Sequence, residues 1–172
     1  MTNPVSQNSP EPWLRGTLTE LPPVPRAVIH AFELAKEDVW KWCYSLSDAQ
    51  LNARPSGIQS VAFQLRHIAR GLDRLLTYAE GGQLTQKQLD ALKTELDGGA
   101  KHDDLFSELA QALSRSTTRV GALAALGLEA PRVVGKKRLP STVGGLLVHI
   151  AEHTQRHVGQ AILTAKIVTA AR

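Results

Sequence analysis

The sequence predicts an all-α protein whose architecture is a four-helix bundle. Four long segments carry apolar residues at helical spacing, and stretches containing glycine or proline separate them. Apolar residues make up 42% of the chain and aromatic residues only 5%, and the abundance of Leu and Ala favours helices over a β-sandwich. A chain of 172 residues suffices for one sizeable core but not for two. We therefore expect a flexible, proline-containing arm over residues 1–20 and a single helical-bundle domain over residues 21–172.

The first long helix is predicted to run from about Pro25 to about Leu46. Proline suits the opening turn of a helix because it has no amide hydrogen to donate and its φ is already helical. Ser47 is then an N-cap for a short turn of helix over residues 48–51. The stretch 54–57, Arg-Pro-Ser-Gly, breaks the chain before the next long segment.

The second long helix is predicted over residues 60–80, and Gly81-Gly82 ends it. Thr85 and Gln88 then have the spacing of a capping box, which predicts a short helix over residues 86–96. The apolar face of the second helix consists of Val61, Leu65, Ile68, Leu72, Leu75, Leu76 and Ala79.

The third long helix is predicted from near Asp103 to near Gly127, with the Asp103 carboxylate complementing the helix dipole. Residues 128–140 contain β-branched residues, a glycine and the basic run 136–138, and they predict a loop or a minimal hairpin. Ser141 is the expected cap of the last helix, which runs to about Ala170.

Composition and charge narrow the classes of function. Cys43 is the only cysteine, so neither an internal disulfide nor a cysteine-rich zinc site can form, and its aromatic neighbours predict a structural thiol. Charged or polar residues interrupt each apolar stretch before it reaches the roughly 20 residues that span a bilayer. The first dozen residues lack the features of a signal peptide. We therefore expect a cytoplasmic protein with no membrane partner.

Three histidines in the last predicted helix, His149, His153 and His157, recur at every fourth residue. Side chains at this spacing lie one above another on a helix face, with β-carbons about 5–6 Å apart, so that two imidazoles can bind one metal ion. A typical catalytic metal site takes a third protein ligand and keeps one position open. His67, in the second long helix, is the candidate for the third ligand.

Helical projection places both histidine sets beside the apolar face of their helix, at the edge of the core. Gln160 continues the histidine row, whereas Glu152 is predicted to project away from it. Neither Glu80 nor Glu95 has a predicted place, so no general base is identified. We expect His30 and His102 to be ordinary hydrogen-bonded residues outside the site. On the second helix, His67 lies beside Ser60, Gln64 and Gly71.

The order of residues around the histidines rejects one metalloprotease template, the zincin helix. The peptidase helix requires His-Glu-x-x-His, in which glutamate follows the first histidine. Here Thr154 follows His153, and Glu152 precedes it.

Three segments together resemble the DinB-like superfamily of metalloenzymes, which includes thiol-dependent S-transferases and a thiol-dependent maleylpyruvate isomerase. They are residues 46–51 followed by Arg54-Pro55, residues 65–69 (Leu-Arg-His-Ile-Ala), and the pattern His153-x-x-x-His157-x-x-Gln160. The resemblance covers about residues 21–167. It implies a four-helix bundle with a crossover connection, often as a homodimer, and a divalent metal held by His67, His153 and His157. His149 and Gln160 then have a role around the metal or toward substrate.

Such a histidine triad suits Zn²⁺, with Ni²⁺ or Fe²⁺ as alternatives. Activation of a water molecule on the metal would give a hydrolase, and activation of a bound low-molecular-weight thiol would give an S-transferase. In both cases the partner is a small-molecule substrate.

Two other classes of function remain open. A non-catalytic bundle could use the histidines only to brace two helices while a surface binds another protein. A nucleic-acid-binding regulator could use basic residues, since the net charge is +4. We expect no nucleic-acid partner, because Arg66, Arg70 and Arg74 at four-residue spacing are more typical of a solvated ridge. The other basic cluster is Lys136, Lys137 and Arg138.

Overall fold

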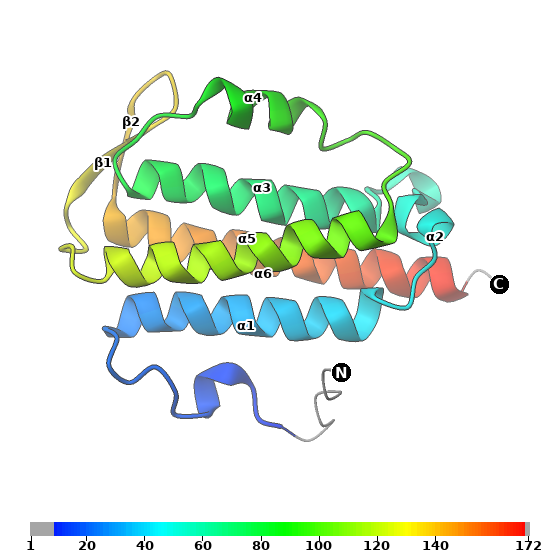
Figure 1. Ribbon diagram of the computed structural model, residues 1–172, viewed down its shortest axis with the longest axis horizontal. Coiled ribbons are helices and arrows are strands. Elements are labelled where there is room, and N and C mark those ends of the chain that lie inside the picture. The colour runs from blue at the N-terminus through cyan, green and yellow to red at the C-terminus, as the bar shows by residue number, and fades with distance from the viewer. Residues whose placement is uncertain (1–8, 171–172) are drawn as a thin grey trace.

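The computed structural model describes residues 9–170, and Figure 1 shows the bundle that they form. The predicted all-α, four-helix architecture is confirmed. The four long helices are α1 (Pro23–Cys43), α3 (Val61–Ala79), α5 (His102–Leu123) and α6 (Val143–Ala170).

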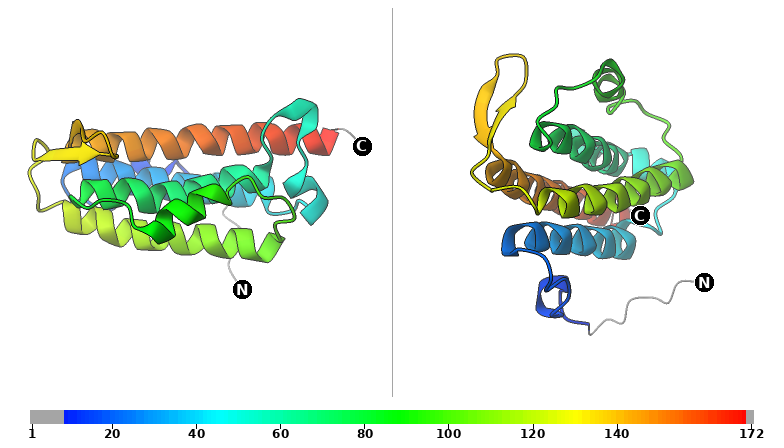
Figure 2. Two further views of the ribbon diagram at one scale, coloured as in Figure 1. Left: turned by 90° about the horizontal axis from the view of Figure 1, so that it is seen from above. Right: turned by 60° about the vertical axis from the view of Figure 1, so that its left-hand side comes forward.

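The order of the helices requires a crossover. Helices α1 and α6 run in one direction, and α3 and α5 run in the other (Figures 1 and 2). The chain leaves α3 at one end of the bundle and returns through α4 (Gln86–Lys93), which lies outside α3, before α5 begins at the other end. Helix α6 contacts both α1 and α3 along much of its length. The antiparallel pair α3 and α6 is the pair on which the predicted histidines lie.

The core lies between the four helices and uses the predicted apolar faces. Side chains from α3 and α6 such as Leu65, Ile68, Leu147 and Ile150 are almost completely buried. Burying a side chain of this size stabilises the fold by about 1.5–3 kcal/mol relative to leaving it exposed. Two helices with complementary apolar faces therefore pack closely and fix the polar side chains along the edge of their contact.

Local capping signals correctly located the short helices. Ser47 caps α2 (Asp48–Asn52), and Thr85 caps α4. In both, the cap hydroxyl accepts a hydrogen bond from the backbone N–H three residues later, as in a capping box. A single turn of 3₁₀ helix, η2 (Pro55–Gly57), occupies the predicted break. Helix α4 ends at Lys93, three residues before the predicted end, and the buried Glu95 follows it.

The segment before α6 is a hairpin, one of the two predicted alternatives. Strand β1 (Pro131–Val134) pairs antiparallel with β2 (Leu139–Thr142). The prediction that Ser141 caps the last helix was wrong, because Ser141 lies within β2 opposite Arg132. The Thr142 hydroxyl instead accepts a hydrogen bond from the backbone N–H of Gly145, at 3.0 Å.

The described part of the predicted N-terminal arm lies along α1, and residues 1–8 are outside the described residues. It contains one turn of 3₁₀ helix, η1 (Pro12–Leu14). Arg15 donates two hydrogen bonds to the carboxylate of Glu37, at 2.6 and 2.8 Å. Residues 9–20 are thus anchored to the bundle by at least one bidentate ion pair.

Two further expectations concern Cys43 and the membrane. Cys43 is completely buried at the end of α1, and burial raises the pKa of its thiol to about 12. It therefore stays protonated near neutral pH, as expected for a structural thiol.

Among the described helices, none combines the length and apolar character needed to cross a bilayer.

Candidate metal centre

Three histidines converge where α3 and α6 lie side by side. His67 comes from α3, and His153 and His157 come from successive turns of α6. Each offers a nitrogen, and these three atoms lie within 4.8 Å of one another. The ring centroids are 4.4 to 4.9 Å apart. The structure therefore brings together the three residues that the sequence singled out as metal ligands.

In two of these rings, Nδ1 is hydrogen-bonded to a residue outside the three histidines. Nδ1 of His67 donates to Oε2 of Glu95 at 2.7 Å, and Nδ1 of His157 donates to Oε1 of Gln64 at 2.7 Å. A carboxylate accepts only, so His67 carries its proton on Nδ1 and presents the lone pair of Nε2. Metal-binding histidines typically donate their other N–H to an oxygen in this way.

The spacing of the inner nitrogens also fits a metal ion. Nε2 of His67 and Nε2 of His153 are 3.1 Å apart. Two nitrogen ligands at 2.0–2.1 Å from a tetrahedral zinc ion lie about 3.3 Å apart. The donor set of neutral imidazoles, its spacing and its outer hydrogen bonds thus fit a divalent transition metal.

Glu95 is the acidic residue nearest this cluster, although the sequence gave it no predicted place. It follows α4 and is only 2% exposed. Nη1 of Arg74 donates to Oε1 of Glu95 at 2.5 Å, so the carboxylate bridges Arg74 and His67. Burial acts to raise the pKa of Glu95, but the hydrogen bonds from His67 and Arg74 outweigh it and lower that pKa below its usual value. Glu95 therefore remains charged and fixes the orientation of His67.

Gly71 provides the space that the His153 ring occupies. A β-carbon at Gly71 would lie 3.0 Å from Cε1 of His153, closer than such contacts normally are. Nδ1 of His153 is buried on this side and has no hydrogen-bond partner among the described residues. The sequence placed Gly71 beside His67 on the helix, and the structure shows that its missing side chain serves the histidine of the opposing helix.

The environment keeps the two α6 histidines neutral. The pKa of His153 is lowered to about 3 and that of His157 to about 4. Burial is the main cause for both rings, and repulsion from neighbouring imidazoles and Arg156 adds to it. Near neutral pH both rings are therefore uncharged, and each has one nitrogen lone pair that a metal ion can bind.

His149 and Gln160 flank the cluster on α6. The His149 ring lies 5.8 Å from that of His153, and its side chain is 43% exposed. Nδ1 of His149 donates to Oε1 of Glu152 at 2.7 Å. The prediction that Glu152 projects away from the row was wrong, because at a spacing of three residues its side chain reaches back to His149. Gln160 is exposed and lies one turn after His157 on α6.

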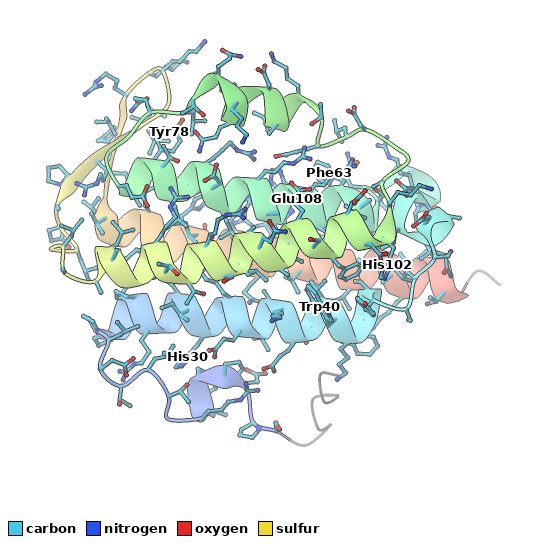
Figure 3. The ribbon with its side chains drawn as sticks, viewed as in Figure 1. His30, Trp40, Phe63, Tyr78, His102 and Glu108 are labelled. Carbon is cyan, nitrogen blue, oxygen red and sulfur yellow. The ribbon has the colours of Figure 1, made fainter. Side chains whose placement is uncertain are left out.

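Phe63 covers the outer face of His67. The two rings are stacked, with centroids 5.3 Å apart and an angle of 18° between their planes. Phe63 is labelled on α3 in Figure 3. Its place one turn before His67 could have been anticipated from helical spacing.

The remaining histidines lie elsewhere, as predicted. His30 is buried against the N-terminal segment, with Nε2 3.1 Å from the Thr17 hydroxyl. His102, at the start of α5, contacts the backbone oxygen of Tyr44 and the carboxylate of Asp103. Figure 3 shows the two on different sides of the bundle. Both are engaged in local hydrogen bonds.

The three arginines of α3 do not form the predicted solvated ridge. Arg66 donates to the backbone oxygen of Asp97, and Arg70 donates to Glu108 and to the backbone oxygen of Ala91. Together with Arg74 they fasten the segment that contains α4 to the bundle. The expectation failed because the crossover returns the chain over this face of α3.

Comparison with known proteins agrees with the fold. A family model described as the DinB superfamily matches residues 31–161, a span that includes the three histidines and most of the bundle. No curated protein matches the chain. The match covers more than half of the sequence, and the chain therefore belongs to the DinB superfamily.

Proposed function

We propose that His67, His153 and His157 bind one divalent transition metal ion and that the protein is a metal-dependent enzyme acting on a small molecule. The observation that carries this proposal is the outward hydrogen bonding of two of the rings. Glu95 and Gln64 occupy the Nδ1 atoms of His67 and His157, which leaves the Nε2 atoms for a shared ligand. Neutral imidazoles suit Zn²⁺ best, with Ni²⁺ and Fe²⁺ as alternatives.

Such an ion supplies Lewis acidity, which lowers the pKa of a water or thiol ligand toward neutrality. With water as the nucleophile the reaction is a hydrolysis. With a low-molecular-weight thiol it is an S-transfer. Three protein ligands leave room for either nucleophile.

His149 is the candidate proton acceptor for the reaction. Because Glu152 accepts the Nδ1 hydrogen, the neutral His149 ring has its lone pair on Nε2. In our proposal, the O–H or S–H proton of the nucleophile passes to this nitrogen as the nucleophile attacks. The ring is beside His153 and open to solvent, so the proton can leave to water afterwards. Gln160, exposed at the other end of the row, offers an amide that can orient the substrate.

Elemental analysis of the native purified protein, combined with a screen of thiols, tests this proposal. About one transition metal ion per chain is expected. Metal-free protein that fails to bind Zn²⁺, Ni²⁺ and Co²⁺ at neutral pH would contradict it. In the Co²⁺-loaded protein, a change in the visible spectrum on adding a thiol would favour S-transfer, whereas an unchanged spectrum together with ester or amide cleavage would favour hydrolysis.

A further inference from the structure

A cavity lies beneath α4, and none of the three clustered histidines lines it. Its volume is about 650 Å³, and its walls come from α3, α4 and α5. Figure 2 shows α4 held away from the bundle over this region. Small-molecule sites typically enclose about 300–1,000 Å³. Thr77, Thr85 and Thr94 are among the lining residues, and each of their hydroxyls already donates a hydrogen bond to an oxygen of a nearby residue.

Most of the charges around this cavity neutralise one another. Nε of Arg70 donates to Glu108 at 2.8 Å, and Glu108 lies between α5 and α3 (Figure 3). Asp73 accepts from Nη1 of Arg119 at 2.8 Å and from the Gln88 amide at 2.7 Å. Arg74 is paired with Glu95. Both acidic residues of the wall are therefore engaged by an arginine, and the arginine that binds Asp73 is shared with Glu80.

Two cations of the cavity wall are left in excess. Lys87 on α4 and Arg115 on α5 both line the cavity, and among the described residues neither has a carboxylate within ion-pair distance. Among the described residues, the side chain of Arg115 makes one hydrogen bond, a long one to Gln111 at 3.4 Å. Two cations without an ion-pair partner that line one cavity from different helices favour a negatively charged ligand.

We propose that this cavity binds a small organic dianion through Lys87 and Arg115. The guanidinium of Arg115 presents parallel N–H donors that match a carboxylate or a phosphate group. Lys87 supplies a second positive charge from α4, on another wall of the cavity. The shared chemistry is that of a phosphate monoester or a dicarboxylate. Attraction between exposed charges is screened by salt, so binding should weaken as ionic strength rises.

Calorimetric titration of the metal-free protein with inorganic phosphate and with succinate tests the proposal. Metal-free protein is used so that anions cannot bind to a metal at the histidine cluster. We expect one site per chain, and the preferred probe indicates whether the natural ligand carries a phosphate or two carboxylates. Lys87→Gln and Arg115→Gln should each weaken binding about tenfold, because each removes one charge-assisted contact.

Lys93→Gln is the matched control. This lysine is also on α4, but it does not line the cavity and it is paired with Asp90. Its affinity for both anions should equal that of the unmodified protein. Arg74 is left unchanged because it also holds Glu95. The proposal is overturned if neither anion binds, if the Lys87 and Arg115 variants bind as tightly as the unmodified protein, or if the Lys93 variant loses as much affinity as they do. Anion binding without metal binding would leave this site standing and reject only the metal centre.

Discussion

Arg74 and Glu95 form a buried ion pair, 2.5 Å from Nη1 to Oε1, and the other oxygen of this carboxylate accepts from His67. Arg74 comes from the same helix as His67, whereas Glu95 belongs to the crossover segment. The position of one predicted metal ligand thus depends on a carboxylate that reaches it only because the chain returns over α3.

Glu95→Gln should weaken zinc binding about 10- to 100-fold, the usual effect of removing an outer partner of a metal-binding histidine. The amide cannot accept from both Arg74 and His67 as a charged carboxylate does. Zinc affinity is measured by competition with a chromophoric chelator. Glu108→Gln is the matched control. Glu108 pairs with Arg70, one turn before Arg74 on α3, and it does not contact a histidine. Equal zinc affinity in the two variants would show that Glu95 does not support the site.

Gly71→Ala should weaken metal binding although alanine is the better helix former. The new methyl group would lie 3.0 Å from Cε1 of His153 and push the ring from its place. Replacing an interior helical glycine by alanine otherwise stabilises a helix by about 1 kcal/mol. Gly159→Ala is the control, since a β-carbon there meets no atom within 4 Å. Thermal unfolding and zinc titration of both variants check the prediction, which fails if Gly71→Ala binds zinc normally.

The metal-free protein should lose stability as the pH falls below about 6.5. The folded-state pKa values of His153 and His157 are about 3 and about 4, below the ordinary histidine pKa of 6.5. Between the folded-state values and 6.5, the unfolded chain binds protons that the folded chain does not. The free energy of unfolding therefore decreases as the pH is lowered through this range. The slope is at most about 1.4 kcal/mol per pH unit for each ring, and less because both rings are partly solvated.

Thermal unfolding from pH 7.5 to pH 5 measures this loss. The range stays above the pKa of ordinary carboxyl groups, so the histidines dominate the change. The double variant His153→Gln, His157→Gln should show a flatter dependence of Tm on pH. The same slope in both proteins would assign the pH dependence to other groups.

His149→Ala and Gln160→Ala should leave metal content nearly intact and weaken binding of substrate or thiol. His149 bonds to Glu152 and Gln160 is exposed, so neither is needed to hold the ion in our proposal. Elemental analysis and thiol titration are made on both variants. If His149 is the proton acceptor, the pH–rate profile of its variant should also lose the acidic limb, the fall in rate at low pH that protonation of a base causes. Loss of the metal itself would instead make that residue a ligand.

The sequence predicted the helical bundle because helices are indicated by residues that lie close together in the chain. Apolar spacing identified the buried faces of α3 and α6, and these faces set His67 against the histidines of α6. The caps at Ser47 and Thr85 were also found, since a capping box involves residues only three positions apart. At Ser141 the same reasoning failed, because strand pairing with β1 moved the helix start to the next residues.

The outer contacts of the cluster could not be predicted in the same way. Glu95 and the arginines of α3 meet through the crossover, and no periodicity describes where that segment crosses α3. Gln64 could be placed beside His67 on its helix, but its actual partner, His157, belongs to a helix far along the chain. These contacts depend on tertiary packing rather than on local pattern.

Zinc titration of four alanine variants tests the central claim most directly. His67, His153 and His157 are each replaced, and His30→Ala is the control because its ring contacts Thr17 on another side of the bundle. With the fold verified by circular dichroism, each of the three site variants should lose most of its zinc affinity, and the His30 variant should bind as the unmodified protein does. Retained affinity in all three site variants would contradict the metal centre.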